Sequence, residues 1–241
     1  MIITLDGPAG SGKSATARKL AARLGVPYLD TGAMYRVVTL AALEDGVDLN
    51  DDARLAGLAA SDIYTLDLGP THMRVTLRGR DVTEEIRSMR VNDHTRFVAA
   101  LPGVRRALVE RQRAIAHQLG SVVTEGRDQG SVAFPDADMK FFLDATLEKR
   151  AERRLHDLWA DGEEVTLAQV LENLRTRDQT DQQRAVGPLT VPPGAIRIDT
   201  TRLSIAQVLD LMVEHLRGAG LLRDRADGKS GAAGSAPARE P

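Results

Sequence analysis

The chain starts with a strand-like run, a glycine-rich loop and a helix-forming stretch, in that order. Residues 2–5 are apolar, Asp6 ends the run, residues 7–14 read GPAGSGKS, and residues 13–24 are rich in helix formers. Glycines allow backbone N–H groups to turn inward around phosphate oxygens, and the N-terminus of a following helix adds positive potential. An ordinary glycine turn would not need this spacing or these flanking elements. The sequence therefore predicts a phosphate-binding P-loop.

Two side chains of this loop have predicted roles of their own. Lys13 would reach the outer phosphates of a bound nucleotide, and the hydroxyl of Ser14 would ligate Mg²⁺. The residues expected to contact the nucleotide phosphates are Gly7, Pro8, Ala9, Gly10, Ser11, Gly12, Lys13, Ser14 and Ala15.

Later apolar runs have the length of buried strands. They lie at residues 26–29, 121–124, 139–143 and 195–198, and helical stretches alternate with them. This rhythm is typical of a parallel sheet covered by helices, in which ligands bind at the carboxyl ends of the strands. We expect an α/β P-loop NTPase fold with a five-stranded parallel sheet.

Residues 31–119 interrupt this alternation of predicted strands and helices. A helix is expected near residues 35–43, alternating segments at 63–68 and 73–77 predict a hairpin, and residues 78–82 could add a short third strand. A further helix is expected from residue 104 to 119. The predicted organisation is a core of residues 1–30 and 120–217, an insert of residues 31–119, and a disordered tail of residues 218–241, where Gly, Ala, Ser and Pro dominate.

The polar stretch at about residues 153–185 has too few apolar side chains to stay packed, and it is rich in arginine. A capping box at Thr166 and Gln169 predicts a helix that runs to about Arg175. A lid that closes over reactants would exclude water, the competing acceptor of a phosphate group. We expect this stretch to be a helical lid.

The composition excludes several classes of protein. Lys and Arg total 32 against 34 Asp and Glu, so the formal net charge of -2 provides no general attraction to nucleic acid or to an anionic membrane. Cys is absent, which excludes disulfides and thiolate metal sites. No window approaches the roughly 18 apolar residues of a membrane span. We expect a cytoplasmic protein, monomeric by default, without a nucleic-acid or membrane partner.

A P-loop alone does not distinguish between a kinase, a GTPase, a motor ATPase and a nucleotide-binding module without transfer activity. No Asn residue begins an Asn-Lys-x-Asp guanine motif, which disfavours a GTPase, and a nucleic-acid motor would need a basic face. Two further motifs follow predicted strands: DTGAMYR at residues 30–36 and EGRD at residues 125–128. Both would lie at the carboxyl ends of strands, where a second substrate could bind.

With these motifs the chain resembles bacterial-type CMP kinases, of the nucleoside monophosphate kinase group, from residue 2 to about residue 216. The similar segments also include VAALPGVR at residues 98–105 and the pattern RDxxDxxR at residues 177–184. The resemblance implies transfer of the terminal phosphate of ATP to CMP or dCMP, in pyrimidine nucleotide metabolism, with Mg²⁺ as cofactor. It also implies that the insert is the monophosphate-binding module.

The resemblance also implies roles for single residues. Arg36 and Arg127 would hold the acceptor phosphate, because guanidinium groups suit bidentate contact with phosphate oxygens. Asp128 and Arg105 would read the cytosine ring. The remaining implied roles are the sugar-binding set Asp181, Arg177 and Arg184, the nucleoside pocket with Thr31 and Tyr35, and the catalytic set Lys13, Arg127 and Arg177.

One position departs from the family pattern, and several alternatives stay open at this point. Arg96 stands where the family tends to place a small hydroxyl residue beside the base, with Thr95 adjacent. Glu125 could act on a metal-bound water or be a surface carboxylate at a strand end. The other candidate residues also have interpretations without a binding role. These are a solvated Arg105, structural ion pairs of Arg36 and Arg127, an isolated surface pair of Asp181 and Arg184, and a Tyr35 that only packs in the core.

Two other functions also remain open. A P-loop kinase acting on UMP, AMP or shikimate would share the donor site and differ in the acceptor residues. A P-loop binding module would bind ATP and transfer nothing.

Overall fold

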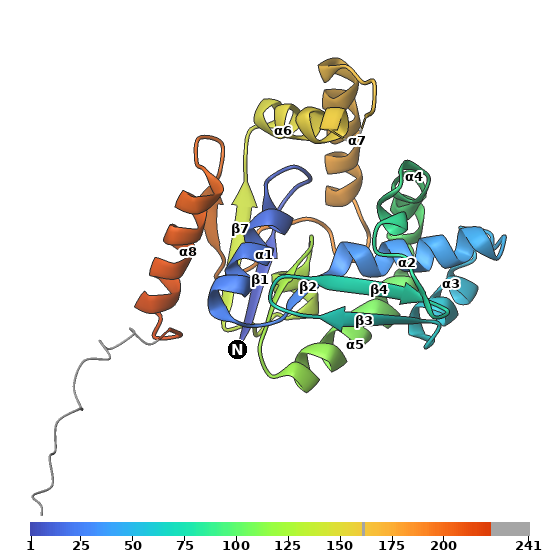
Figure 1. The fold of residues 1–241 in the computed structure, drawn as a ribbon, viewed down its shortest axis with the longest axis horizontal. Helices are drawn as coiled ribbons and strands as arrows, with labels where there is room; N and C mark the ends of the chain where they lie inside the picture. The colour runs from blue at the N-terminus through green and yellow to red at the C-terminus, as the bar shows by residue number, and fades with distance from the viewer. Residues whose placement is uncertain (161, 223–241) are drawn as a thin grey trace, which may run out of the picture.

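A computed structural model describes residues 1–160 and 162–222 of the chain and shows the predicted parallel sheet (Figure 1). All of its strand pairs are parallel, and the strand order is β2-β6-β1-β7-β8. The five strands are β1 (Ile2–Asp6), β2 (Tyr28–Asp30), β6 (Val122–Glu125), β7 (Met139–Asp144) and β8 (Ile196–Asp199). The five-stranded sheet and its α/β class are therefore confirmed.

Strand β1 occupies the centre of the sheet, which explains its continuous apolar run. Ile3 pairs with Val123 on one side and with Met139 on the other. Ile3 and Leu5 are 0% exposed. Burial on both faces of a parallel sheet selects an unbroken apolar run over an alternating one. The chain leaves the sheet at Asp6 and turns directly into the P-loop.

Helices α1 (Lys13–Leu24) and α8 (Ile205–Gly218) contact each other, and α1 packs on β6 and β2. The N-terminus of α8 has a capping box formed by Ser204 and Gln207. Leu221 and Leu222, which the sequence analysis placed in the tail, pack against the core. Gly218, also placed in the expected tail, is the last residue of α8. Residues 223–241 of the expected tail lie outside the described residues.

The insert follows β2 and lies to one side of the sheet (Figure 1). The predicted hairpin is confirmed as β3 (Tyr64–Leu68) and β4 (Met73–Leu77), and β5 (Arg80–Asp81) is the short third strand. The helices of the insert are α2 (Thr31–Glu44), α3 (Asp52–Ala60), α4 (Met89–Val98) and α5 (Pro102–Leu119), with a 3-10 turn η1 (Glu85–Arg87) before α4. The sequence analysis did not predict α3 or α4, which have only 9 and 10 residues.

Two further helices, α6 (Leu147–Ala160) and α7 (Leu167–Gln182), form the segment predicted as a lid. The capping box at Thr166 is present, but α7 runs seven residues beyond the expected end at Arg175. A small separate cluster holds the two helices together, and it includes Val170 and Leu174. The indole Nε1 of Trp159 donates to the Val165 carbonyl at 3.0 Å, and the residue is 59% exposed.

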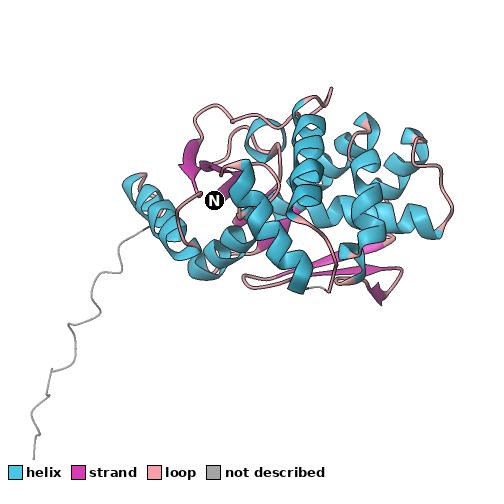
Figure 2. Ribbon diagram, turned by 90° about the horizontal axis from the view of Figure 1, so that it is seen from above, coloured by secondary structure: helices cyan, strands magenta, loops and turns pink. Residues whose placement is uncertain are grey.

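The P-loop, helices α6 and α7 and one end of the insert lie beyond the carboxyl ends of the parallel strands (Figure 1). The view from above shows helices around the carboxyl ends of the parallel strands (Figure 2). Within residues 1–160 and 162–222, no helix is long and apolar enough to cross a membrane.

Candidate active site

The P-loop has the backbone geometry that a phosphate cradle needs. Gly7, Gly10 and Gly12 have positive φ values of 147, 76 and 90°. A Cβ at Gly7 would lie 2.0 Å from the Leu143 carbonyl oxygen, so only glycine fits there. No side chain caps the N-terminus of α1. Its first backbone N–H groups are therefore available to an anion.

Lys13 lies over this loop rather than reaching away from it. Its Nζ donates to the Pro8 carbonyl at 2.7 Å and to Ser11 Oγ at 3.4 Å. Burial, and then the charge of Arg127, lower the pKa of Lys13 to about 7. Phosphate oxygens beside the ammonium group would favour its charged form and raise this pKa again.

Glu125 is buried beside the P-loop, with 5% exposure, so the alternative of a surface carboxylate at a strand end is wrong. Ser14 Oγ donates to Glu125 Oε1 at 2.6 Å, and the Tyr28 hydroxyl donates to the same oxygen at 3.4 Å. Burial raises the pKa of Glu125, and Asp30 raises it further. A hydroxyl and a carboxylate thus share one position at the mouth of the phosphate loop.

These oxygen atoms fit Mg²⁺, which prefers hard oxygen ligands and commonly takes one or two from the protein and the rest from phosphates and water. In the described part of the chain, no group of three or more His, Asp or Glu side chains could hold a metal ion. Ser14 and Glu125 are therefore the residues that would hold Mg²⁺, together with the nucleotide itself.

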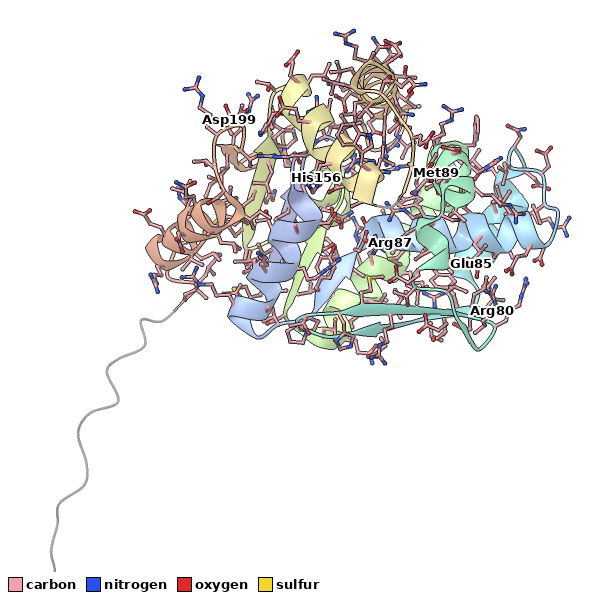
Figure 3. All side chains as sticks on the ribbon, turned by 45° about the horizontal axis from the view of Figure 1, so that its top comes forward. Arg80, Glu85, Arg87, Met89, His156 and Asp199 are labelled. Atoms are coloured by element: carbon pink, nitrogen blue, oxygen red, sulfur yellow. The ribbon has the colours of Figure 1, made fainter. Side chains whose placement is uncertain are left out.

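Arg36 lies on α2 and is held by two partners of the core and insert. Its Nε donates to Asn92 Oδ1 at 3.1 Å, and one of its terminal nitrogens lies 3.8 Å from Asp30 Oδ2. That nitrogen is buried and has no hydrogen-bond partner among the described residues. Arg87 also contacts Asp30, at 3.1 Å, and Figure 3 shows it at the edge of the insert that faces the core. Two guanidinium groups thus gather around one carboxylate.

Arg127 and Arg184 share a second buried carboxylate, that of Asp181, which is 1% exposed. Arg127 Nε donates to Asp181 Oδ2 at 2.7 Å, and Arg184 donates to the other carboxylate oxygen. Burial alone would raise the pKa of Asp181, but the two arginines outweigh it and hold the pKa below its ordinary value. The alternative of an isolated surface pair is therefore wrong.

Arg177 differs from these arginines because it has no hydrogen bond or ion pair with any residue that the structure describes. Its side chain keeps contact with solvent. Crowding by the surrounding chain, and then Arg127, lower its pKa to about 10, which leaves the group charged at neutral pH. A charged, unpaired guanidinium beside Arg127 is well suited to an anion that arrives between them.

Arg105 and Asp128 form a buried ion pair, with side-chain exposures of 3% and 7%. One terminal nitrogen of Arg105 donates to Asp128 Oδ2, and the other donates to the Ala99 carbonyl at 3.1 Å. The alternative of a solvated Arg105 is therefore wrong. Arg105 also lies over the ring of Tyr35, 5.7 Å from its centroid, so Tyr35 packs in the core and contacts this pair.

Thr31 and Gly187 complete the surroundings of these groups. Thr31 Oγ1 donates to the Glu125 carbonyl at 2.8 Å, which ties the start of α2 to the end of β6. A Cβ at Gly187 would lie 2.2 Å from both Arg105 and Asp128. The sequence analysis missed Gly187, although its place shortly after Arg184 puts it in the same segment.

Comparison with known proteins identifies the family. A sequence model described as cytidylate kinase matches residues 3–218. The chain is 46% identical over 215 residues to a cytidylate kinase of Caldanaerobacter subterraneus subsp. tengcongensis, covering 89% of this chain and 94% of that protein. The chain belongs to the cytidylate kinase family.

Another cytidylate kinase, from Pseudomonas fluorescens, is 46% identical over 217 residues, with 89% of this chain and 94% of that protein covered. Among solved structures, a shikimate kinase from Acinetobacter baumannii in complex with shikimate aligns with a TM-score of 0.45 at 15% identity, over 92% of this chain and 95% of that one. A similarity of this size says nothing about the substrate.

Arg96 remains the departure from the cytidylate kinase pattern. Its residue is exposed, and its guanidinium lies 4.7 Å from the centroid of the Phe97 ring. The neighbouring Thr95 hydroxyl donates to the Val91 carbonyl at 2.7 Å, within its own helix. Neither side chain forms a hydrogen bond or an ion pair with Arg105 or Asp128.

Sequence reasoning also missed the contacts of Arg150. Arg150 donates to the carbonyls of Ala145 and Ala9, each at 3.1 Å, and contacts Asp178 at 2.7 Å. It therefore joins the P-loop to α7 one residue beyond Arg177. No local signal distinguishes Arg150 from the other arginines of α6.

Proposed function

We propose that this protein transfers the terminal phosphate of ATP to the phosphate of CMP or dCMP, with Mg²⁺, and so produces ADP and CDP or dCDP in pyrimidine nucleotide metabolism. The observation that carries this proposal is the buried Arg105–Asp128 pair, whose Asp128 directly precedes the two residues that are held by Asp6, the residue before the P-loop. Membership of the cytidylate kinase family supports the same activity.

On the donor side, the P-loop amides and Lys13 would bind the β- and γ-phosphates of ATP. Mg²⁺, when bound by Ser14 and Glu125, would supply positive charge to the phosphate oxygens. The hydrogen bonds from Lys13 Nζ to Pro8 and Ser11 would give way to bonds with the phosphates. The cost of burying the ammonium is then offset by a fixed negative partner.

On the acceptor side, Arg36 and Arg127 would bind the monophosphate in line with the donor. Their charges are held in place by Asp30 and Asp181. The acceptor oxygen is already ionised at neutral pH, so the reaction needs positive charge and alignment and no general base. Arg177, which has no partner among the described residues, would stabilise the group in transfer.

The Arg105–Asp128 pair would select the base. Asp128 Oδ2 accepts from Arg105, and the remaining oxygen can accept a hydrogen bond from the exocyclic amino group of cytosine. Arg105 would donate to the ring acceptors. Uracil has a carbonyl where cytosine has the amino group, so this carbonyl would face the second carboxylate oxygen and leave that oxygen without a donor. The pair therefore favours cytosine.

Asp181, with Arg177 and Arg184, would bind the sugar, and Thr31 and Tyr35 would line the nucleoside pocket. We also propose that α6 and α7 close over the reactants as a lid, residues 153–185, and that residues 31–119 move with the acceptor as a module. The cluster that joins α6 and α7 is separate from the main core and includes Ala9 of the P-loop, so the two helices would move as one unit beside the donor loop. The cytoplasmic location and the monomeric state stay predictions.

The test is coupled ADP production with CMP, dCMP, UMP, AMP and shikimate at equal concentration. We expect turnover with CMP and dCMP and much slower turnover with the others. A lack of CMP preference would favour a P-loop kinase of another substrate. ATP binding without ADP production on any acceptor would favour a binding module and contradict the proposal.

A further inference from the structure

The two segments that carry the base-reading pair are each anchored by a carboxylate from another element. Asp6, at the end of β1, accepts from the backbone N–H groups of Gln129 at 2.8 Å and Gly130 at 2.7 Å. These are the two residues directly after Asp128. Asp6 is 0% exposed, and each of its oxygens takes one of the two bonds.

Asp52, at the start of α3, makes the same kind of contact to α5. Its carboxylate accepts from the backbone N–H groups of Gly103 at 2.9 Å and Val104 at 3.1 Å. These residues directly precede Arg105. The N-cap residue of α5 is Leu101, which has no side-chain cap to offer. Asp52 therefore supplies from outside the cap that the helix lacks.

We infer that Asp6 and Asp52 are positioning residues for the Arg105–Asp128 pair, and that they thereby set the preference for cytosine. The inference rests on the proposed function. Neither carboxylate is placed to touch a substrate in the site described above. Each acts through the backbone within two residues of a group that would read the base.

The two anchors divide the task between different parts of the molecule. Asp6 lies one residue before Gly7, so it fixes Asp128 relative to the P-loop. Asp52 fixes Arg105 inside the insert, because α3 and α5 pack against each other. The pair bridges the core and the insert, and its geometry depends on both anchors. A displacement of about 1 Å at a recognition group can cost a large factor in rate.

The chemistry of the contacts supports a role that needs charge. Burial raises the pKa of Asp6 to about 6, although the two hydrogen bonds from backbone N–H groups lower it. The negative charge of Asp128 raises this pKa further, and the positive charge of Lys13 lowers it. Asp6 is therefore ionised at neutral pH and can accept from both N–H groups. An amide in its place offers one acceptor and turns its own N–H₂ group toward the second N–H.

The experiment measures kcat and KM for CMP, UMP and ATP in Asp52→Asn and Asp6→Asn. We expect the ratio of kcat/KM for CMP to that for UMP to fall about tenfold in each variant. KM for ATP should stay within about twofold of its original value in Asp52→Asn, because that anchor is confined to the insert. An unchanged CMP to UMP ratio in either folded variant would overturn the inference.

Matched controls separate positioning from general damage. Asp51→Asn changes the adjacent carboxylate, which caps its own helix by accepting from the Arg54 N–H at 3.0 Å and does not contact α5. Asp144→Asn changes a carboxylate at the end of the neighbouring strand β7, where it accepts from the Ala145 N–H at 2.9 Å. Both should keep the CMP to UMP ratio. A fall in the ratio equal to that of the test variants would overturn the inference.

Two further variants keep the test decisive if an Asn variant does not fold. Gly103→Ala places a Cβ 2.6 Å from Asp52 Oδ1, which forces the carboxylate away while alanine favours the helix. Asp6→Ser keeps one acceptor in a smaller side chain. Both should lower the ratio of kcat/KM for CMP to that for UMP. A folded variant that keeps this ratio would overturn the inference, because the anchor would be lost without an effect on base selection.

A double-mutant cycle adds a readout that a structural role would not move. In an Asp128→Asn background the base-reading pair is already broken, so adding Asp52→Asn should change the CMP to UMP ratio little further. Full additivity would overturn the inference. If the unaltered enzyme shows no CMP preference, the proposed function fails before any variant is compared; if it prefers CMP and the variants do too, only the positioning role fails.

Discussion

The donor and acceptor halves of this site differ in how the chain builds them. The donor half is one continuous stretch, residues 7–15, whose shape is set by backbone conformation. The acceptor half gathers side chains from α2, α5, the loop after β6 and α7, and buried carboxylates hold its arginines. Changes in the donor half should therefore act on the chemical step, whereas changes in the acceptor half should act on which molecule is accepted.

The largest effect should come from Lys13→Ala in the donor half. Loss of a charge that stabilises the transferring phosphate should lower kcat by about 10³-fold. The measurement is ADP production at saturating CMP and ATP. Lys19→Ala, on the exposed side of the same helix, is the control and should keep its activity. A loss below about threefold in Lys13→Ala would contradict the proposed role.

Arg177→Ala tests the place where the donor and acceptor halves meet, because Arg177 would act on the phosphate as it passes between them. The side chain has no partner among the described residues, so its removal should lower kcat by about 10²-fold and leave the melting temperature unchanged. Turnover and thermal unfolding are measured on the same sample, with Arg175→Ala as the exposed control on α7. Equal losses of turnover and stability would refute a catalytic role for Arg177.

Asp128→Asn tests selectivity in the acceptor half. The amide can donate to the carbonyl of uracil, so the preference for CMP over UMP should fall by about 10-fold, with a smaller change in the KM for ATP. Competition between the two nucleotides in one assay measures this ratio directly. The exposed Asp136→Asn is the control. Retention of the original preference would remove Asp128 from base recognition.

The smallest expected effect is the uptake of a proton when ATP binds to the donor half. The pKa of Lys13 is lowered from its ordinary 10.5 to about 7, so the free protein holds this group largely neutral at pH 8. Phosphate raises the pKa, and ATP binding at pH 8 should take up about one proton, with less uptake near pH 6. Titration calorimetry in buffers of different ionisation enthalpy measures the uptake, and Lys13→Ala should abolish it.

The same lowered pKa has a consequence for stability, with a definite sign. Between pH 7 and 10.5 the unfolded chain binds a proton on Lys13 that the folded chain has lost. Stability of the free protein therefore gains a contribution that rises with pH through this window. Denaturant unfolding of the original protein and Lys13→Ala should differ in this slope. Equal slopes would contradict the lowered pKa.

The sequence predicted the donor half and the sheet because their signals are local. The glycines of residues 7–12 and the apolar runs of the strands lie next to the structure they determine. The acceptor half has no such signal. Arg105 has the spacing of a solvated charge on a helix, and only its partner Asp128, 23 residues away, explains its burial. Family resemblance, rather than spacing, brought these residues together in the sequence analysis.

The supporting residues were missed for the same reason. Asn92 and Arg87 lie in short elements of the insert that the sequence analysis did not predict, and both act on groups more than 50 residues away in the chain. Asp52 caps a helix that starts about 50 residues later. Contacts of this kind depend on how α3, α4 and α5 pack, which periodicity within one segment does not determine.

Trp159 is the one tryptophan of the chain, and it lies in the last turn of α6, exposed and hydrogen-bonded to the Val165 carbonyl. Its emission would therefore come from a single place, near the C-terminal end of α6. Rapid mixing with nucleotides would follow any rearrangement of α6 and α7 around this residue in real time, without any attached dye.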